Sequence, residues 1–257
     1  MVTFGLNIFS VIPLRKGSSH QSEMVSQILF GEIFEILDKQ SDWSHVRLHA
    51  DGYTGWIQDM QVYPISQETY LNLQTTSILP IEKFIEYNTR SIFLPKGSHI
   101  WGKTTAAFLG QFHFQLDNIF PSHHNQNVWQ TAESFLYAPY LWGGKTIFGI
   151  DCSGLVQVSF SIHGIQLPRD AYQQAVLGLD SDIYTCEPGD LAFFKNQDGK
   201  ITHVGIIYSR ENHDIKIIHS SSFVRIDYLD EQGIYRQDEH LNKVYTHRLS
   251  HIKRIAL

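Results

Sequence analysis

The feature that most restricts the fold of this chain is a change of hydrophobic period in its second half. After Asp151, apolar residues recur at helical spacing over 155–162, and Gly164 follows them. Asp at the N-cap and Gly beyond the last turn are typical helix boundaries. Residues 190–210 then read as two strands joined by an Asp-Gly turn, and 213–222 as a third. A helix followed by consecutive antiparallel strands predicts an α+β domain.

The amino-terminal quarter has a different pattern. Short apolar runs between glycines fill residues 11–65, and runs of that length predict a small β-barrel domain over 1–65. The runs are 25–30, 33–37, 46–48 and 55–57.

A mixed segment, 66–122, comes next. It contains a short helical pattern near 68–73 and β-like stretches at 91–94 and 105–115. We interpret the segment either as a second, degenerate β-module or as an elaborated linker.

The polar stretch PSHHNQN, 121–127, marks a boundary, so we expect the α+β domain to cover 123–257. Helical spacing predicts a helix over 128–138 at its start. His123 and His124 are adjacent in this stretch, without a carboxylate or cysteine at ligand spacing. We therefore expect no metal site.

Composition limits the partners and the compartment. The formal charge is −6, from 26 acidic and 20 basic residues without a basic block, so we expect neither nucleic acid nor a membrane as a partner. No apolar run reaches the roughly 18 residues of a membrane span. The first apolar stretch has no positive residue ahead of it, which favours a cytoplasmic location without excluding export. Two cysteines cannot build a disulfide framework, and we expect reduced thiols.

Cys152 is predicted to be the first residue of the helix after Asp151. The unpaired N–H groups of a helix start favour a thiolate and can donate to the oxyanion that forms when a carbonyl is attacked. Cysteine is also among the most buried residue types, so a structural role remains the alternative. A nucleophilic cysteine needs an imidazole base and a third group that orients it.

His203 and His219 are the candidates among 14 histidines. Alternation places His203 on one strand face with Gly205, which leaves room for a reacting group. If the following loop is 209–213, His219 lies directly opposite His203 and the two rings can hydrogen-bond. The alternative is that both are ordinary strand residues.

With these residues assembled, the sequence resembles the NlpC-type cell-wall cysteine endopeptidases, which have a reduced papain-like α+β fold. The resemblance is carried by PYLWGGKTIFGIDCSGLV (139–156), PGDLAFF (188–194), THVGIIY (202–208) and IIHSSS (217–222).

SEMVSQILFGE (22–32) and DGYTGWI (51–57) are similar to a subgroup with one or two bacterial SH3-type domains, related to dipeptidyl-peptidase VI. Members cleave γ-D-glutamyl–L-diamino-acid bonds in peptidoglycan peptides that begin with a free L-Ala.

The resemblance implies roles for individual residues. Cys152 would be the nucleophile, His203 the general base and acid, and His219 the orienting residue, with Tyr140 near the oxyanion. The implied substrate-binding residues are Asp151, Ser153, Tyr53, Glu23, Arg169 and Asp170. Asp151 and Glu23 could hold the desolvated amine of the substrate, although Asp151 can also simply cap the helix. Cys186 matches no catalytic position.

The expected reaction is acyl transfer without a cofactor or metal, and the third residue of the peptide is either diaminopimelate or lysine. Two other functions fit the same residues less well. An acyltransferase or amidase could use the same nucleophile. A non-catalytic wall-binding protein would rely on the SH3-type domain alone, but it would not need a cysteine with a placed base.

Overall fold

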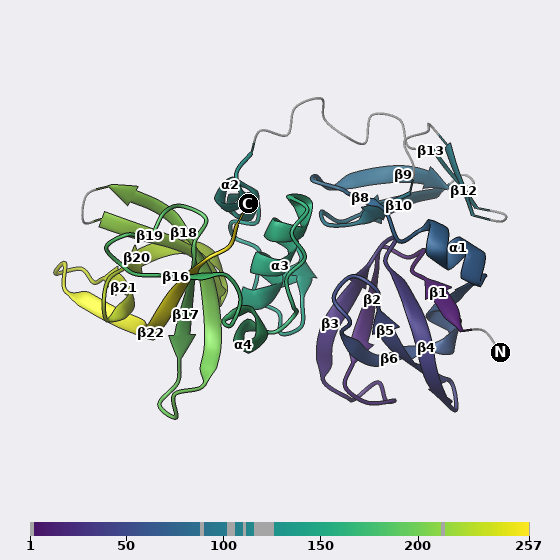
Figure 1. Ribbon diagram of the computed structural model, residues 1–257, viewed down its shortest axis with the longest axis horizontal. Coiled ribbons are helices and arrows are strands. Elements are labelled where there is room, and N and C mark those ends of the chain that lie inside the picture. Colours follow the sequence, from purple (N-terminus) through teal and green to yellow (C-terminus); the bar gives the residue numbers. More distant parts are fainter. Residues whose placement is uncertain are drawn as a thin grey trace. The chain divides into compact units, whose positions relative to one another are not determined.

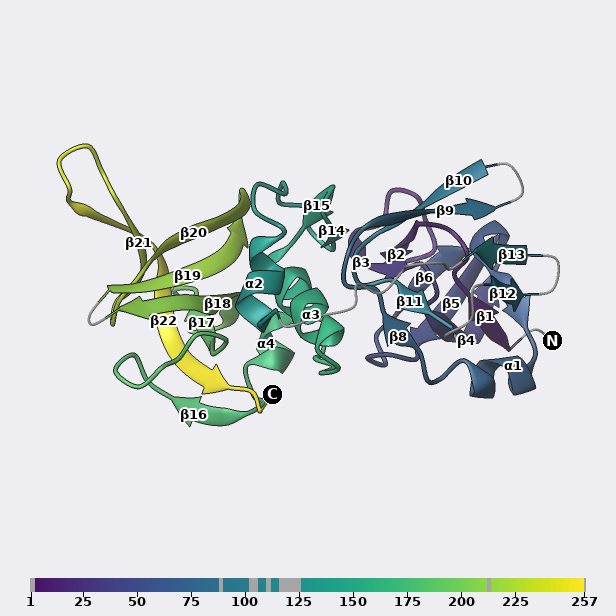
Figure 2. The same cartoon turned by 90° about the horizontal axis from the view of Figure 1, so that it is seen from above.

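The computed structural model describes residues 3–87, 90–101, 106–109, 112–115, 126–211 and 214–256. The chain divides into two compact units. Unit 1 is Met1–His124 with the short segment Trp142–Thr146, and unit 2 is Asn125–Leu141 with Ile147–Leu257. Each unit is built around its own seven-stranded sheet (Figures 1 and 2).

Unit 1 begins with an antiparallel sheet in the order β3-β2-β6-β5-β4-β1-β7. Its apolar core comprises Ile12, Leu14, Ile28, Phe34, Val46, Leu48 and Ile57. The predicted small β-domain is confirmed, because the short apolar runs form its strands. The strands are β1 (Phe4–Leu6), β2 (Val11–Arg15), β3 (Met24–Leu29), β4 (Ile33–Gln40), β5 (Trp43–Leu48), β6 (Thr54–Gln58) and β7 (Tyr63–Ile65), with a 3-10 helix, η1 (Asp59–Gln61), before β7.

The mixed segment that follows packs onto this sheet. Buried side chains of the segment, among them Tyr70, Leu79 and Ile100, share a core with Leu6 of β1 and with Phe30, which follows β3. The strands of the segment pair two by two, as β9–β10, β8–β11 and β12–β13. Its elements are α1 (Gln67–Asn72), β8 (Ser77–Ile78), β9 (Lys83–Tyr87), β10 (Arg90–Leu94), β11 (His99–Ile100), β12 (Ala106–Leu109) and β13 (Phe112–Gln115). His123 and His124 lie outside the described residues.

The segment Trp142–Thr146, which ends in β14 (Lys145–Thr146), also belongs to unit 1. Gly143 has φ +78°, and a Cβ there would lie 2.6 Å from the Met24 carbonyl oxygen. The Lys145 backbone N–H donates to Gln27 Oε1 at 2.7 Å, and Lys145 Nζ pairs with buried Glu32 at 3.3 Å. Only glycine allows the backbone to approach β3 this closely.

Unit 2 contains the predicted α+β arrangement. Its antiparallel sheet has the order β16-β22-β17-β18-β19-β20-β21, and β22 also pairs with β21, so the six strands β17 to β22 close into a ring. The strands are β16 (Leu179–Ser181), β17 (Leu191–Lys195), β18 (Ile201–Glu211), β19 (Asp214–Ser221), β20 (Phe223–Leu229), β21 (Gly233–Gln237) and β22 (Lys243–Arg254).

The helices of unit 2 are short, except one. They are α2 (Val128–Glu133), α3 (Cys152–Ile162) and α4 (Ala171–Gln174), and the two-residue strand β15 (Gly149–Ile150) precedes α3. The helix α3 packs against β18 and β19, and α2 packs against α3 (Figure 1). Among the described residues, no helix has the length and apolar character needed to cross a membrane.

The boundaries of α3 match the prediction, whereas those of α2 do not. Gly164 has φ +81° and follows the end of α3. The predicted helix over 128–138 is wrong in its second half, because α2 ends at Glu133. The amides of Phe135 and Leu136 bond three residues back, and Tyr137 has φ +69°. This tightening ends the helix before Pro139 is reached.

Candidate active site

The start of α3 positions Cys152. Asp151 is the N-cap in extended conformation, and its Oδ1 accepts the Gly154 N–H at 2.7 Å. Cys152 is therefore the first helical residue, as predicted, and its side chain is only 6% exposed. The backbone N–H groups of Val204 and Ser153 donate to the Cys152 sulfur. The thiol thus lies beside the residue that follows His203 on β18.

Burial raises the pKa of the Cys152 thiol to about 12, and the charge of Asp151 adds to the rise. The donors on Val204 and Ser153 and the charge of Arg169 act in the opposite direction, but they are weaker. Burial therefore opposes the thiolate that the start of a helix favours. The thiol is neutral at rest and needs a base to remove its proton.

His203 lies on β18 in a position suited to be that base. Its side chain is 6% exposed, and Phe194 contacts it with ring centroids 5.7 Å apart. Burial, with the nearby charges of His219, His247 and Arg225, lowers the pKa of His203 well below its ordinary value. The imidazole is therefore neutral at pH 7 and keeps a lone pair.

A chain of hydrogen bonds continues from His203 to His219 and Asp227. His203 Nε2 lies 2.9 Å from His219 Nδ1, and His219 Nε2 lies 3.1 Å from Asp227 Oδ2. A carboxylate can only accept, so His219 carries its proton on Nε2 and accepts on Nδ1. His203 must then donate from Nε2, which leaves its Nδ1 lone pair for the thiol.

Asp227 was not predicted from the sequence. It lies on β20, is 8% exposed, and accepts from Arg225 Nε at 2.8 Å. Although burial raises it, hydrogen bonds from His219 and Arg225 hold the pKa of Asp227 below its ordinary value. A single acidic residue in the apolar strand pattern FVRIDYL is the only signal in the sequence that could have indicated it.

The contact between His203 and His219 was predicted, but the register behind it is wrong. The pairing runs Ile206 with Ile218 and Ile207 with Ile217, is irregular before Ser209, and places Glu211 opposite Asp214. The loop is therefore shorter than 209–213, and the two histidines are not directly opposite.

The rings meet diagonally instead, because Gly205 has no side chain between them. A Cβ at Gly205 would lie 3.0 Å from His219 Cβ. Gly205 thus makes space for His219 of the neighbouring strand. We had expected it to leave room for a reacting group.

Tyr140 lies close to the thiol. Its backbone N–H donates to the Ser222 carbonyl at 2.9 Å, and its side chain is half-buried. Burial raises the pKa of Tyr140, and the negative charge of nearby Asp151 adds to the rise, as would that of Cys152 when it is ionised. The phenol keeps its proton at neutral pH and can donate to an oxyanion.

Asp151, Ser153 and Arg169 form a buried cluster. Arg169 is 1% exposed; its Nη1 donates to Asp151 Oδ1 at 3.0 Å and its Nη2 to Asp151 Oδ2 at 2.5 Å. Arg169 Nη1 also donates to Ser153 Oγ at 2.9 Å. The pair is bidentate, so much of the charge of Asp151 is matched by Arg169. Asp170 follows directly as the N-cap of α4, in a capping box with Gln173.

The structure places Glu23 and Tyr53 in unit 1, whereas the other predicted site residues belong to unit 2. Glu23 pairs with Lys16 at 3.3 Å and accepts from Trp142 Nε1 at 2.8 Å. Tyr53 packs against the core of the β1–β7 sheet. Their substrate-binding roles stay predictions.

Cys186 and one pocket of unit 2 do not belong to the group of predicted site residues. Cys186 is fully buried in an apolar cluster with Ala192, Phe194 and Ile207, and burial raises the pKa of Cys186 to about 11. This agrees with a structural role.

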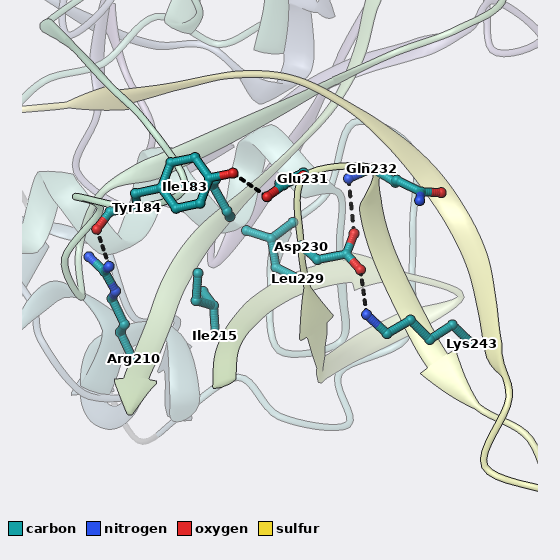
Figure 3. Close-up of a pocket in the computed structure, with 9 residues that line it drawn as sticks. All are labelled: Ile183, Tyr184, Arg210, Ile215, Leu229, Asp230, Glu231, Gln232 and Lys243. Atoms are coloured by element: carbon teal, nitrogen blue, oxygen red, sulfur yellow. Dashed lines mark hydrogen bonds and ion pairs between the residues drawn. The ribbon is translucent and has the colours of Figure 1, made fainter. Parts of the chain in front are cut away.

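A pocket of about 300 Å³ lies between the ends of β18–β20 and neighbouring loops (Figure 3). Its lining residues are Ile183, Tyr184, Arg210, Ile215, Leu229, Asp230, Glu231, Gln232 and Lys243. Several of its polar groups bond one another: Tyr184 donates to Glu231, and Lys243 to Asp230. We assign no function to it.

Comparison with known proteins gives two family matches. Residues 137–244 match the NlpC/P60 family, and residues 14–62 match the bacterial dipeptidyl-peptidase SH3 domain. The NlpC/P60 match includes Cys152, His203 and His219, and the SH3 match covers most of the first sheet. The predicted resemblance is thereby confirmed.

Relatives and a solved structure agree with these matches. The γ-D-glutamyl-L-lysine dipeptidyl-peptidase of Bacillus subtilis is 31% identical over 212 residues, covering 75% of this chain and 72% of the relative. Dipeptidyl-peptidase 6 of Lysinibacillus sphaericus is 28% identical over 253 residues, covering 84% and 89%.

An NlpC/P60 family protein from Bacillus cereus has the same fold, with a TM-score of 0.79 at 20% identity over 98% of this chain and 99% of that chain. The family match on the catalytic region, the SH3 match at the amino-terminal end and these relatives agree with one another. The chain belongs to the NlpC/P60 family of cysteine peptidases and carries a bacterial dipeptidyl-peptidase SH3 domain.

Proposed function

We propose that this peptidase hydrolyses the γ-D-glutamyl–L-diamino-acid bond of peptidoglycan-derived peptides that begin with a free L-Ala. The observation that carries the proposal is the hydrogen-bonded chain from Asp227 through His219 to His203, beside Cys152 at the start of α3. The name of the Bacillus subtilis relative, γ-D-glutamyl-L-lysine dipeptidyl-peptidase, supports the choice of bond.

The first step is proton transfer from Cys152 to Nδ1 of His203. Both groups are neutral at rest, because burial raises the pKa of the thiol to about 12 and lowers that of the imidazole. His219 and Asp227 favour the transfer, because they hold His203 in one tautomer and stabilise the imidazolium that forms.

The thiolate then attacks the γ-carbonyl carbon of D-Glu and forms a C–S bond. Backbone N–H groups at the start of α3 and the phenol of Tyr140 would donate to the developing oxyanion. As the intermediate collapses, the C–N bond breaks and His203 gives its proton to the departing amine of the diamino acid. Water then attacks the thioester carbonyl carbon while His203 takes a proton from it. The C–S bond breaks, the dipeptide leaves as a carboxylic acid, and His203 returns the proton to the Cys152 sulfur.

The implied substrate-binding residues belong to this proposal as well. A desolvated ammonium needs an anionic partner. Asp151 shares its charge with Arg169, so the cluster of Asp151, Ser153 and Arg169 offers both signs of charge to a substrate that carries an amine and carboxylates. Asp170 would act beside it. On the resemblance alone, we also propose that Glu23 and Tyr53 bind the free amine of the substrate. A requirement for a free amine suits small released wall fragments, which favours action in the cytoplasm.

The test uses L-Ala-γ-D-Glu-diaminopimelate, its L-Lys counterpart and the N-acetylated form of each, with products identified by mass spectrometry. We expect release of L-Ala-D-Glu from a free-amine peptide only, and its loss in Cys152→Ala. Equal cleavage of free and acetylated peptides would refute the amine requirement. Transfer of the dipeptide to an added amine or alcohol in place of water would indicate an acyltransferase, and binding of wall fragments without cleavage would indicate a wall-binding protein.

A further inference from the structure

Three histidines meet where β18, β19 and β22 face one another. Among the described residues, one ring nitrogen from each of His203, His219 and His247 lies within 4.8 Å of the others. The rings of His203 and His247 stack with centroids 4.2 Å apart, and the His219 ring is nearly perpendicular to both. The peptidase reaction derived above uses two of these rings and leaves His247 without a role.

Imidazole is a preferred ligand of zinc and similar divalent ions, and it must be neutral to bind them. Three imidazole nitrogens within 4.8 Å of one another therefore match the donor set that such an ion prefers.

The cluster also has the outer support that metal ligands need. A zinc-binding histidine commonly donates its second ring N–H to a carboxylate. His219 Nε2 already faces Asp227 Oδ2 at 3.1 Å, with Nδ1 turned to the cluster. His219 therefore already has the tautomer of a metal ligand. Arg225 forms an ion pair with the Asp227 carboxylate.

An ion can reach the cluster from the side of His247. His203 and His219 are buried, but His247 is half-buried. It lines an open pocket of about 670 Å³ together with Lys195, Glu231, Gln232, Tyr245, Thr246, Arg248 and Leu249. His247 thus stands between solvent and the catalytic pair.

We propose that His203, His219 and His247 form a binding site for a divalent transition-metal ion, with Zn²⁺ as the expected ion. Three ligands at about 2.0–2.1 Å in tetrahedral geometry have nitrogens about 3.4 Å apart. His203 Nε2 and His219 Nδ1, at 2.9 Å, separate slightly to admit the ion. His247 swings from its stacked position, which its partial exposure permits.

Binding would stop the proposed peptidase reaction, a consequence that rests on the proposed function. The ion takes the Nε2 lone pair of His203, so the proton of that nitrogen moves to Nδ1. Nδ1 then has no lone pair with which to accept the thiol proton of Cys152. Zinc is therefore a reversible inhibitor that acts through the base.

The decisive test measures binding and does not depend on catalysis. Zn²⁺ is titrated calorimetrically into the full chain and its Cys152→Ala, His247→Ala and His251→Ala variants. His251 is the matched control, because it lies on the same strand and stacks on Phe193 outside the cluster. We expect one equivalent per chain in wild type, Cys152→Ala and His251→Ala, and none in His247→Ala. Unchanged binding in His247→Ala, or its loss in Cys152→Ala, would overturn the site.

Co²⁺ serves as a spectroscopic probe of the same site. Tetrahedral nitrogen ligands give visible bands without the near-ultraviolet thiolate charge-transfer band, and that band would refute a site without sulfur. Asp227→Asn should weaken Zn²⁺ binding about 10- to 100-fold, the usual effect of losing a carboxylate behind a histidine ligand. His247→Gln and circular dichroism of each variant separate loss of a ligand from loss of folding.

Peptide hydrolysis with and without Zn²⁺ is measured in a separate experiment. If the peptide is cleaved, Zn²⁺ should inhibit wild type and chelator should restore it. If the peptide is not cleaved, the proposed function fails while the binding measurements still decide the metal site. Cleavage that is insensitive to saturating Zn²⁺ would refute the inhibitory consequence.

Discussion

At the scale of single residues, burial is the largest influence on the pKa of Cys152. Cys152 begins a helix and accepts from the Ser153 and Val204 backbone N–H groups, yet its pKa rises to about 12 because the thiol is desolvated beside Asp151. The helix start and the Val204 amide reduce the rise without reversing it. In the proposed reaction, such a thiol needs activation by a general base.

Alkylation of Cys152 tests this directly. In a Cys186→Ala background, we expect the iodoacetamide rate to be low at pH 7 and to increase up to about pH 12, because only the thiolate reacts and burial opposes it. The rate is measured by mass spectrometry against pH, with an unfolded sample as the reference. A plateau of high reactivity between pH 5 and 8 would contradict the expectation.

Asp227 is a positioning residue that acts through His219. In Asp227→Asn the amide can donate to His219 Nε2, which favours the wrong tautomer of His219 and then of His203. We expect kcat to fall by up to about 10²–10⁴-fold, the range that a positioned base contributes, with KM unchanged. Asp230→Asn is the matched control, because Asp230 lies nearby but bonds Lys243 and Tyr245 instead. A fall in kcat of the same size in both variants would indicate a general structural effect.

At the scale of elements, the β18–β19 pair brings the two catalytic histidines together without placing them opposite. The pairing is irregular between Ile207 and Ser209, which shifts the register. Gly205 compensates, because its missing side chain lets His219 approach. The strand pair thus depends on one glycine for the geometry of the site.

Gly205→Ala is expected to disturb both stability and catalysis. The new Cβ would lie 2.8 Å from Ile217 Cδ1 and 3.0 Å from His219 Cβ. Overpacking of this kind costs about 1–3 kcal/mol, and displacement of His219 should lower kcat. Urea unfolding and peptide hydrolysis measure the two effects. Gly17→Ala serves as the control, because its new Cβ would approach only the Ser22 side chain, at 3.3 Å from Oγ. A Gly205→Ala variant as stable and active as the wild type would refute this account.

At the scale of the whole molecule, histidines that are partly or fully buried occur in both units. Burial lowers the pKa of His99 in unit 1 to about 3 and that of His247 in unit 2 to about 4, and it lowers the pKa of His203 as well. The folded state therefore binds fewer protons than the unfolded chain below the ordinary histidine pKa of 6.5.

The chain should accordingly lose stability in acid. The contribution of these histidines is fully present above pH 6.5 and is lost as pH falls below that value, for His247 down to about pH 4. We expect the melting temperature to decrease from pH 7 to pH 4, and to decrease less in His247→Gln. Thermal unfolding by circular dichroism measures this at constant ionic strength. A melting temperature that does not change over this range would refute the expectation.

Much of the fold and part of the site could be predicted from the residues in order. Asp151 as N-cap, Cys152 as first helical residue and Gly164 after the last turn follow from local backbone preferences, and β17–β19 follow from alternation and an Asp-Gly turn. The pairing of His203 with His219 was also predicted, although through the wrong register. The predicted helix over 128–138 was wrong in its second half, because apolar spacing does not show where the last turn of a helix tightens.

What the sequence by itself determined is therefore the order of elements from α3 to β19, together with the positions of Cys152 and His203 on them. These depend on near neighbours in the chain. Only the tertiary structure decided that β22 closes the ring of strands, that His247 stacks on His203, and that Asp227 stands behind His219. It also decided that the Cys152 thiol is buried, which raises its pKa. The burial of a side chain and the register of two strands depend on residues that are distant in the sequence. A local sequence pattern therefore cannot predict them.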